Sequence, residues 1–282
     1  MYYCIYSDKY FKNDHMNIEH IIPKSLGGSD DFTILVNRDA NSHLGSSVDG
    51  KFGNDFLVKM KQINSNYIGH SKKPPYLKLK NSKINNSPVN VTFRKNDLEI
   101  YDPINKRLLV GENAIEISTR LDLDIRLKFI SKVALSTGYF LYGDTFVKYA
   151  DHNSLRRVIF SDNLKGESLD LRFYDNLHPI EKKDSLDINM IKFLFKYLKD
   201  SCVIVSYSPS SIIVHVSIGG DFIGMVNFKA NIKYFPNDDE YRLGKVLLCN
   251  DGKLIEKSFW KTIYDMNKDL GLVDIDDSEL DL

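Results

Sequence analysis

The sequence predicts an α+β protein, in which helices and antiparallel strands occupy separate stretches of the chain. Three observations support this. Short apolar strands open the chain at 2–6, 17–22 and 32–36. Apolar residues recur at helical spacing further on, most regularly at 122–143. Residues 201–230 alternate apolar runs with tight turns, which is typical of an antiparallel meander.

Residues 1–65 are predicted to form a first module of strands followed by a helix. A loop from Gly27 to Asp31 separates the strands at 17–22 and 32–36. The pattern then becomes helical: Asp39 is the expected N-cap, and apolar residues recur at 44, 48, 52 and 56. Glycines at 45, 50 and 53 weaken this helix, so we expect a break or a second short helix near 50–53.

Two further regions complete the predicted organisation. Residues 66–110 are expected to form a basic linker, which could add an edge strand, and a β-hairpin that turns at "KND" (95–97). Residues 111–282 are expected to form a larger α+β domain that selects substrate, regulates the module or dimerises. Its elements are helices at 122–143 and about 186–199, and the meander turned at "SPSS" and "GGD".

Charge is balanced overall but not locally. The chain has 38 basic and 38 acidic residues, so net charge does not indicate a nucleic-acid partner. Residues 51–110, however, contain twelve Lys or Arg and four Asp or Glu, a net charge of +8. From Asp265 onward, seven acidic residues accompany one lysine. A basic face for phosphates is therefore compatible with the sequence, although solvated faces of both signs are the commoner arrangement.

Cysteine content and hydropathy give an expectation of compartment. Three scattered cysteines, Cys4, Cys202 and Cys249, do not form a disulfide framework, which fits a reducing environment. No apolar run approaches the roughly 18 residues that a membrane-spanning helix needs. We expect a cytoplasmic protein without a membrane partner.

The pair Glu19-His20 carries the chemistry that the sequence indicates most clearly. It ends a strand just before a proline and a glycine pair, and Asn41 lies in the first turn of the helix that follows. If that helix packs across the hairpin, the three side chains can converge. A carboxylate and an amide oxygen are hard ligands suited to Mg²⁺, and an imidazole can take a proton from an attacking water. The alternative is a histidine that is merely hydrogen-bonded in a surface hairpin.

The motifs "EHIIPKSLGG" (19–28) and "LVNRDANSHLG" (35–45) resemble the HNH, or ββα-metal, endonuclease family. The similarity covers about residues 2–57 and is strongest to the branch that reads Glu-His-x-x-Pro-Lys-x-Leu-Gly-Gly and then Asn-x-x-Leu-Gly. It implies an N-terminal ββα-metal module, His20 as general base, and Glu19 and Asn41 as ligands of one divalent metal, Mg²⁺ or Mn²⁺. It also implies hydrolysis of phosphodiester bonds in DNA, with RNA the less favoured substrate. Family analogy alone suggests a role in mobile elements or phage defence.

The chain departs from the family pattern in two places. Many relatives hold a structural zinc with two Cys-x-x-Cys knuckles, which here read "CIYS" (4–7) and "NRDA" (37–40). One thiolate of four remains, so we predict no structural zinc. Instead, apolar packing is expected to hold the module together, through Tyr3, Ile5, Ile21, Leu35, Leu44 and Phe52. The family's middle Asn also has no counterpart near 31–33, where Asp31 could substitute.

Other residues have supporting roles in this interpretation. Lys24, Arg38 and Lys51 lie close enough in sequence to steer or clamp phosphates. Asp49 could be a third ligand, a residue behind the ligands, or a solvated residue on the helix surface. Two rival functions stay open: a non-catalytic nucleic-acid-binding protein built on a decayed nuclease module, and a nuclease gated by a C-terminal domain that senses a ligand or regulatory partner.

Overall fold

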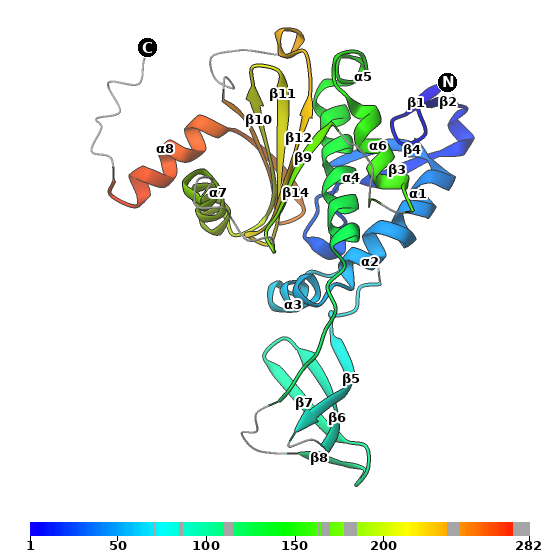
Figure 1. Cartoon of the computed structure of the whole chain (residues 1–282), viewed down its shortest axis with the longest axis vertical. Helices are drawn as coiled ribbons and strands as arrows, with labels where there is room; N and C mark the ends of the chain where they lie inside the picture. Colours follow the sequence, from blue (N-terminus) through cyan, green and yellow to red (C-terminus); the bar gives the residue numbers. More distant parts are fainter. Residues whose placement is uncertain are drawn as a thin grey trace.

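The computed structural model describes residues 1–69, 71–84, 87–109, 115–162, 164, 170–177, 185–235 and 243–272. Its main body has a long helix, α4 (Leu123–Tyr142), between an N-terminal hairpin region and a six-stranded sheet (Figure 1). A second, smaller sheet projects away from this body (Figure 1). The fold is α+β with antiparallel sheets, as the sequence predicts.

The N-terminal region contains two hairpins followed by helix. The first pairs β1 (Tyr2–Cys4) with β2 (Lys9–Phe11). The second pairs β3 (Met16–His20) with β4 (Thr33–Asn37), and α1 (Arg38–Leu44) follows directly. The expected N-cap was two residues late: the side chain of Asn37 accepts hydrogen bonds from the backbone of Asp39 and Ala40. Asn37 is therefore the residue that ends the strand and starts the helix.

The glycines after α1 change the helix without ending it at once. A π-helical turn (Gly45–Asp49) leads into α2 (Gly50–Gly53), and α3 (Phe56–Ser65) begins anew with Asp55 as its N-cap. The expected break near 50–53 is thus confirmed, and it falls at the end of that range. Leu44, Val48 and Phe52 are buried in register, because steps of four keep them on one helix face.

Residues 77–109 form the projecting sheet. Its strands lie in the order β5 (Leu77–Ile84), β6 (Ser87–Arg94), β7 (Asp97–Asp102) and β8 (Arg107–Leu109). The predicted hairpin at "KND" is the turn between β6 and β7, and the predicted edge strand is β5. A small apolar cluster around Val91 and Ile100 holds this sheet together.

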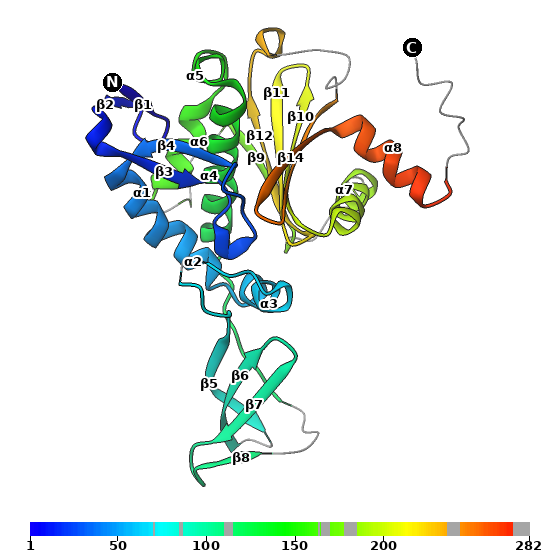
Figure 2. The ribbon, with the colours of Figure 1, turned by 180° about the vertical axis from the view of Figure 1, so that it is seen from behind.

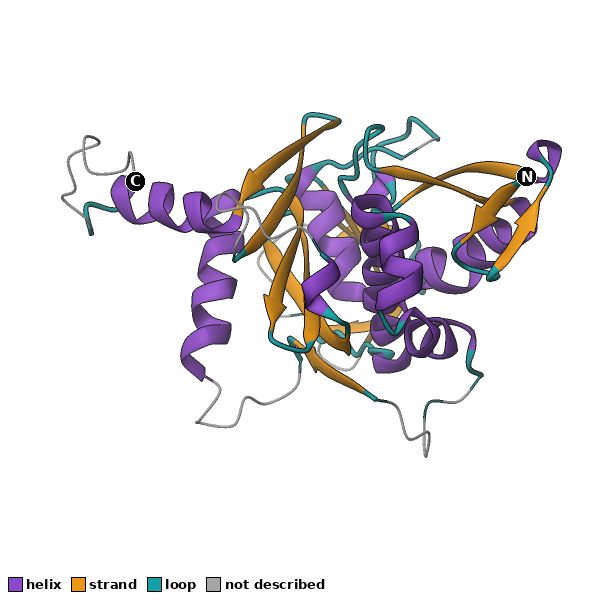
Figure 3. Ribbon diagram, turned by 90° about the horizontal axis from the view of Figure 1, so that it is seen from above, coloured by secondary structure: helices purple, strands orange, loops and turns teal. Residues whose placement is uncertain are grey.

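The C-terminal sheet is covered by helices on both faces (Figure 3). Its antiparallel strands run in the order β14 (Lys253–Ser258), β13 (Gly244–Asn250), β10 (Ser201–Ser208), β11 (Ser211–Ile218), β12 (Asp221–Lys229) and β9 (Leu171–Asp175). On one face lies α4, with α5 (Asp144–Tyr149) and α6 (His152–Phe160) beside it. On the other face lie α7 (Ser185–Leu198) and α8 (Phe259–Asp269). Alternate residues of β10, such as Val203 and Ile204, enter the two different cores.

The largest core joins the N-terminal region to the C-terminal sheet. One cluster of buried side chains contains Ile21 and Phe52 from the first 65 residues together with Phe129 of α4 and Val214 of β11. The hairpin β3–β4 lies against α4, as seen from behind (Figure 2). Helix α4 is buried along most of its length, because it fills the space between the two parts.

The two segments that correspond to the zinc knuckles of relatives, 4–7 and 37–40, contact each other in this core. The buried Cys4 Sγ accepts a hydrogen bond from the Asn37 backbone nitrogen at 3.2 Å. The Asn37 side chain is engaged in capping α1 and donates to the His15 carbonyl. This donor set does not fit a tetrahedral zinc ion. The predicted apolar side chains belong to this core. Four of them are fully buried, those of Ile5, Ile21, Leu44 and Phe52, and Tyr3 and Leu35 pack at its margin.

In the part of the chain that the structure describes, no helix is both long and apolar enough to cross a membrane. Most of the acidic segment that follows Asp269 lies outside the described residues.

Candidate functional site

The end of β3 presents Glu19 and His20 on a strand that turns sharply. Glu19 is buried and His20 is half-buried. The glycine pair makes the following turn possible: Gly27 has a φ of +81°, and a Cβ on Gly28 would lie 1.7 Å from the Ile22 carbonyl oxygen. Only residues without a side chain fit both conditions.

The loop after this turn is anchored on the C-terminal sheet. Ser29 Oγ donates to the Gly252 carbonyl oxygen at 2.8 Å, and the Asp30 backbone nitrogen donates to the same oxygen at 3.3 Å. Ser201 Oγ donates to the Leu26 carbonyl oxygen at 2.5 Å. The β13–β14 turn and the start of β10 therefore fix the position of the loop.

His20 has an acidic partner from this loop. Its Nε2 lies 2.9 Å from Asp30 Oδ1, and Lys24 Nζ lies 2.6 Å from the same oxygen. Hydrogen bonds from Lys24 and His20 lower the pKa of Asp30. The sequence interpretation chose the neighbouring Asp31, but this side chain accepts from the Leu254 backbone at 3.4 Å. The sequence does not show whether Asp30 or Asp31 faces the histidine, because the contacts of the loop with Gly252 decide it.

Asn41 lies against β3, as the packing of a helix across the hairpin requires. Its Nδ2 donates to Asn17 Oδ1 at 2.9 Å and to the Ile18 carbonyl oxygen at 3.2 Å. The amide is thus fixed beside the residue that precedes Glu19. Because the two hydrogens of Nδ2 are directed at the strand, Oδ1 is the atom left to act as a ligand.

The sequence interpretation missed Lys132, a fully buried residue of α4. Its ammonium forms ion pairs with Glu19 Oε1 and with Asp49 Oδ2, the latter at 2.7 Å, and lies 3.3 Å from the His20 carbonyl oxygen. Burial disfavours the charged ammonium, but Asp49, Tyr6 and Glu19 outweigh that cost, and the net pKa of Lys132 is raised. Its position one turn from Phe129, within the apolar stretch 129–135, indicates a buried lysine and could have identified it from the sequence.

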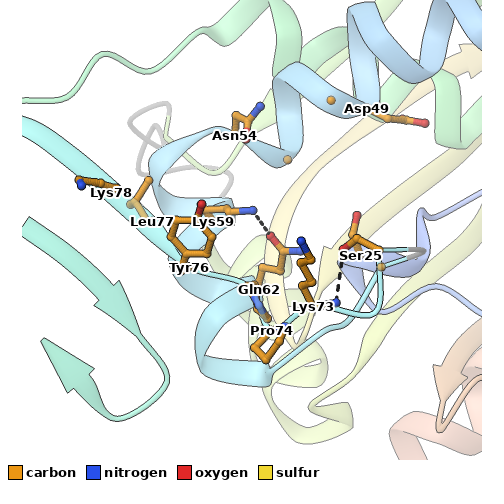
Figure 4. A pocket seen from close by; sticks show the side chains of 15 residues that line it. Ser25, Asp49, Asn54, Lys59, Gln62, Lys73, Pro74, Tyr76, Leu77 and Lys78 are labelled. Atoms are coloured by element: carbon orange, nitrogen blue, oxygen red, sulfur yellow. Dashed lines mark hydrogen bonds between the residues drawn. The ribbon is translucent and has the colours of Figure 1, made fainter. Parts of the chain in front are cut away.

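Glu19 and His20 line a cavity of about 190 Å³. Its lining consists of Glu19, His20, Pro23, Lys24, Ser25, Asp49 and Gly69. A larger groove, about 680 Å³, shares Ser25, Asp49 and Gly69 with it. Figure 4 shows this groove between α2–α3 and the segment that leads to β5, with Lys59, Lys73 and Lys78 along it.

Four of the residues predicted from the sequence, Asp31 among them, do not line either cavity. Asn41 lies beside the strand, as described above, and Arg38 is exposed at the start of α1, where Nη2 donates to the Asp14 carbonyl oxygen at 3.0 Å. Lys51 is exposed on α2. The structure therefore brings together Glu19, His20, Lys24 and Asp49, and adds Asp30 and Lys132 to them.

The donor atoms at this site are chemically suited to a hard divalent cation. In the cavity lining they are the oxygens of the Glu19 and Asp49 carboxylates, and Asp49 Oδ1 is buried without a hydrogen-bond partner. Burial raises the pKa of Asp49 to about 6, although Lys132 opposes the shift. Among the described residues, no group of three or more His, Cys, Asp or Glu side chains is arranged to hold a metal. The acids alone therefore do not make up a complete metal site.

Comparison with known proteins identifies a family for the N-terminal residues. Residues 4–57 match the HNH endonuclease family, whose members are nucleases that generally use divalent metal ions. The searches of curated proteins and of solved structures returned no match. The matched range includes Glu19, His20, Asp30, Asn41 and Asp49, and ends before α4. Residues 4–57, about a fifth of the chain, are thus similar to the HNH endonuclease family.

Proposed function

We propose that this protein is a metal-dependent endonuclease that hydrolyses phosphodiester bonds in DNA, with His20 as the general base. One observation carries the proposal: His20 lines a cavity with the buried Glu19 and the half-buried Asp49, and the exposed Asp30 contacts its ring. A histidine that is merely hydrogen-bonded in a hairpin would not need this set of neighbours.

The Asp30 contact supports a specific role for the imidazole. When Nε2 carries the proton and donates it to Asp30, the lone pair lies on Nδ1, which can then accept a proton from a water molecule. Asp30 also stabilises the imidazolium that forms. Lys24 is positioned to contact a phosphate or to hold Asp30 in place.

We propose that Glu19 and the Asn41 amide hold the divalent metal, with Asp49 beside them. Mg²⁺ and Mn²⁺ both prefer such oxygen ligands. When bound, the metal stabilises the charge that develops on the phosphate oxygens. The buried, partnerless Asp49 Oδ1 supports its proximity to a cation.

The groove beside the cavity supports a nucleic-acid substrate. Lys59 reaches Gln62 at 2.7 Å, and Lys73 and Lys78 follow along the same lining. Tyr76, also in the lining, is 58% exposed and offers an aromatic face to a base. The projecting sheet continues from this groove and belongs to the segment of charge +8. Such a track neutralises phosphates without reading sequence.

The test is cleavage of plasmid DNA in the presence of Mg²⁺ or Mn²⁺ by the wild-type chain and by His20→Ala. We expect cleavage by the wild type and a loss of at least about 100-fold in the variant, the usual contribution of a general base. His43→Ala is the matched control, because His43 is exposed on α1 and lines neither cavity. Equal cleavage by wild type and His20→Ala would refute the assignment, and DNA binding without cleavage under either metal would favour the decayed module.

A further inference from the structure

An ammonium group from outside the matched segment lies in the acid pair of the candidate nuclease site. Lys132 belongs to α4, which begins 66 residues after the match to the HNH family ends at residue 57. It contacts Glu19 of β3 and Asp49 of the π-helical turn, two elements of the matched segment. The two carboxylates and the ammonium together carry a net charge of −1.

The same carboxylates are those that a divalent cation at this site would need. Lys132 is fully buried, and its Nζ is already bonded to oxygens of both acids and faces the His20 carbonyl oxygen. An ammonium and a divalent cation a few ångströms apart repel each other, and the repulsion is stronger where burial reduces screening by solvent, as it does at Lys132. Both therefore cannot hold the acid pair fully at the same time.

We propose that Lys132 is a positioning residue that competes with the divalent metal for Glu19 and Asp49, and so lets α4 set the metal affinity of the nuclease site. The proposal rests on the proposed function only in assuming a metal at these oxygens. Without metal, the Lys132 ammonium offsets the repulsion between the Glu19 and Asp49 carboxylates. Metal loading requires its ammonium to release part of the pair.

Helix α4, which carries Lys132, connects the metal site to the C-terminal sheet. The helix contacts β4 and the π-helical turn on one side and β9, β11 and β12 on the other. A partner or ligand that displaces the C-terminal sheet relative to the hairpin would change how firmly Lys132 holds the acids. Through Lys132, the packing of α4 between these elements thereby affects the metal affinity.

The test measures Mn²⁺ binding to the full chain by isothermal titration calorimetry, without DNA. Lys132→Met removes the charge and keeps most of the volume. Lys132→Gln also removes it but retains a hydrogen-bond donor for the acids. Lys128→Met is the matched control, because Lys128 lies one turn earlier on α4 and its Nζ donates to the Ser161 carbonyl oxygen. We expect each Lys132 variant to bind Mn²⁺ at least about tenfold more tightly than the wild type, and the control to match the wild type.

Thermal unfolding of the same proteins gives a second readout. The Lys132 variants should melt at lower temperature than the wild type without metal, and Mn²⁺ should raise their melting temperature more than that of the wild type. A variant that folds only when Mn²⁺ is present also supports the competition. If Lys132→Gln is folded and binds Mn²⁺ no more tightly than the wild type, or if neither variant folds in any condition, the competition is refuted.

The outcomes separate this inference from the proposed function. If the wild type cleaves DNA and needs His20 but the Lys132 variants gain no metal affinity, the inference fails and the nuclease assignment stands. If Lys132→Gln gains Mn²⁺ affinity and Glu19→Gln removes that gain, the competition stands even when no variant cleaves DNA.

Discussion

Arg126 of α4 joins both halves of the molecule, and replacing it with Met should destabilise the fold strongly. Its Nε donates to Asp175 Oδ2 of β9 at 2.7 Å, and its Nη1 lies 3.7 Å from Asp55, the N-cap of α3. All three side chains are at most 6% exposed. The guanidinium also lies over the Phe52 ring, 5.9 Å from its centroid.

The expected loss follows from this burial. At 2.7 Å and an effective dielectric constant of about 20, the gross attraction between Arg126 and Asp175 is roughly 6 kcal/mol. Desolvation offsets much of it, but truncating one partner leaves Asp175 buried without its counter-charge, which typically costs about 3–5 kcal/mol. At about 2.1 cal/mol/K per residue, 282 residues give an unfolding entropy of about 0.6 kcal/mol/K. The melting temperature should therefore fall by roughly 5–8 °C.

Calorimetry or circular dichroism of the purified chain measures this shift. Arg94→Met is the control, because Arg94 forms surface ion pairs with Asp97 and Glu99 and should lose no more than about 1 kcal/mol. The double variant Arg126→Met/Asp175→Asn should recover part of the loss, since it no longer buries Asp175 as an unpaired charge. A melting temperature within about 1 °C of wild type for Arg126→Met, or losses that simply add in the double variant, would refute the reasoning.

Three further predictions concern the C-terminal sheet, the proposed catalytic base and the proposed DNA-binding groove. Burial lowers the pKa of His215 to about 4, against 6.5 in an unfolded chain, so His215 is neutral in the fold and the unfolded chain binds more protons below pH 6.5. The contribution of neutral His215 to the free energy of unfolding is therefore present above pH 6.5 and is lost as pH falls toward 4. Urea unfolding should show a loss of about 2 kcal/mol between pH 7 and 5 that is absent in His215→Leu. An identical pH dependence in the two proteins would contradict this. Asp30→Asn should reduce DNA cleavage by about tenfold or more, because Asp30 is proposed to hold the His20 ring. It should not lower the melting temperature, because the Asp30 side chain is 64% exposed. Asp31→Asn is the control, and equal losses of cleavage in the two variants would count against a role of Asp30 in orienting His20. Replacing Lys59 and Lys73 by Ala should weaken DNA binding and reduce the slope of log affinity against log salt by about 2, measured by fluorescence anisotropy across NaCl concentrations. The control Lys253→Ala/Lys257→Ala, on the exposed strand β14, should leave the slope unchanged. If both pairs of substitutions change the slope equally, the groove is not the DNA-binding track.

Local patterns were sufficient to predict most elements of this fold. The helix at 122–143, the hairpin at "KND" and the meander at 201–230 appear within one or two residues of their predicted bounds. Each depends on contacts between near neighbours in sequence, such as alternation along a strand or a four-residue helical step. The N-cap was misassigned because Asn37 and Asp39 are both good caps, and only the end of β4 distinguishes them.

The sequence by itself determined the Glu19-His20 pair, the glycine turn that follows it and the Asn41 position on the next helix, because all of them lie in one short stretch with a recognisable spacing. Only the tertiary structure decided that Asp30 rather than Asp31 faces His20, since a contact with Gly252 orients the loop. It also placed Lys132 against Asp49, 83 positions away in the chain. No periodicity within either segment can specify such a contact, because it forms only when α4 packs against the hairpin. That packing places the Lys132 ammonium beside the carboxylates of the buried Glu19 and the half-buried Asp49.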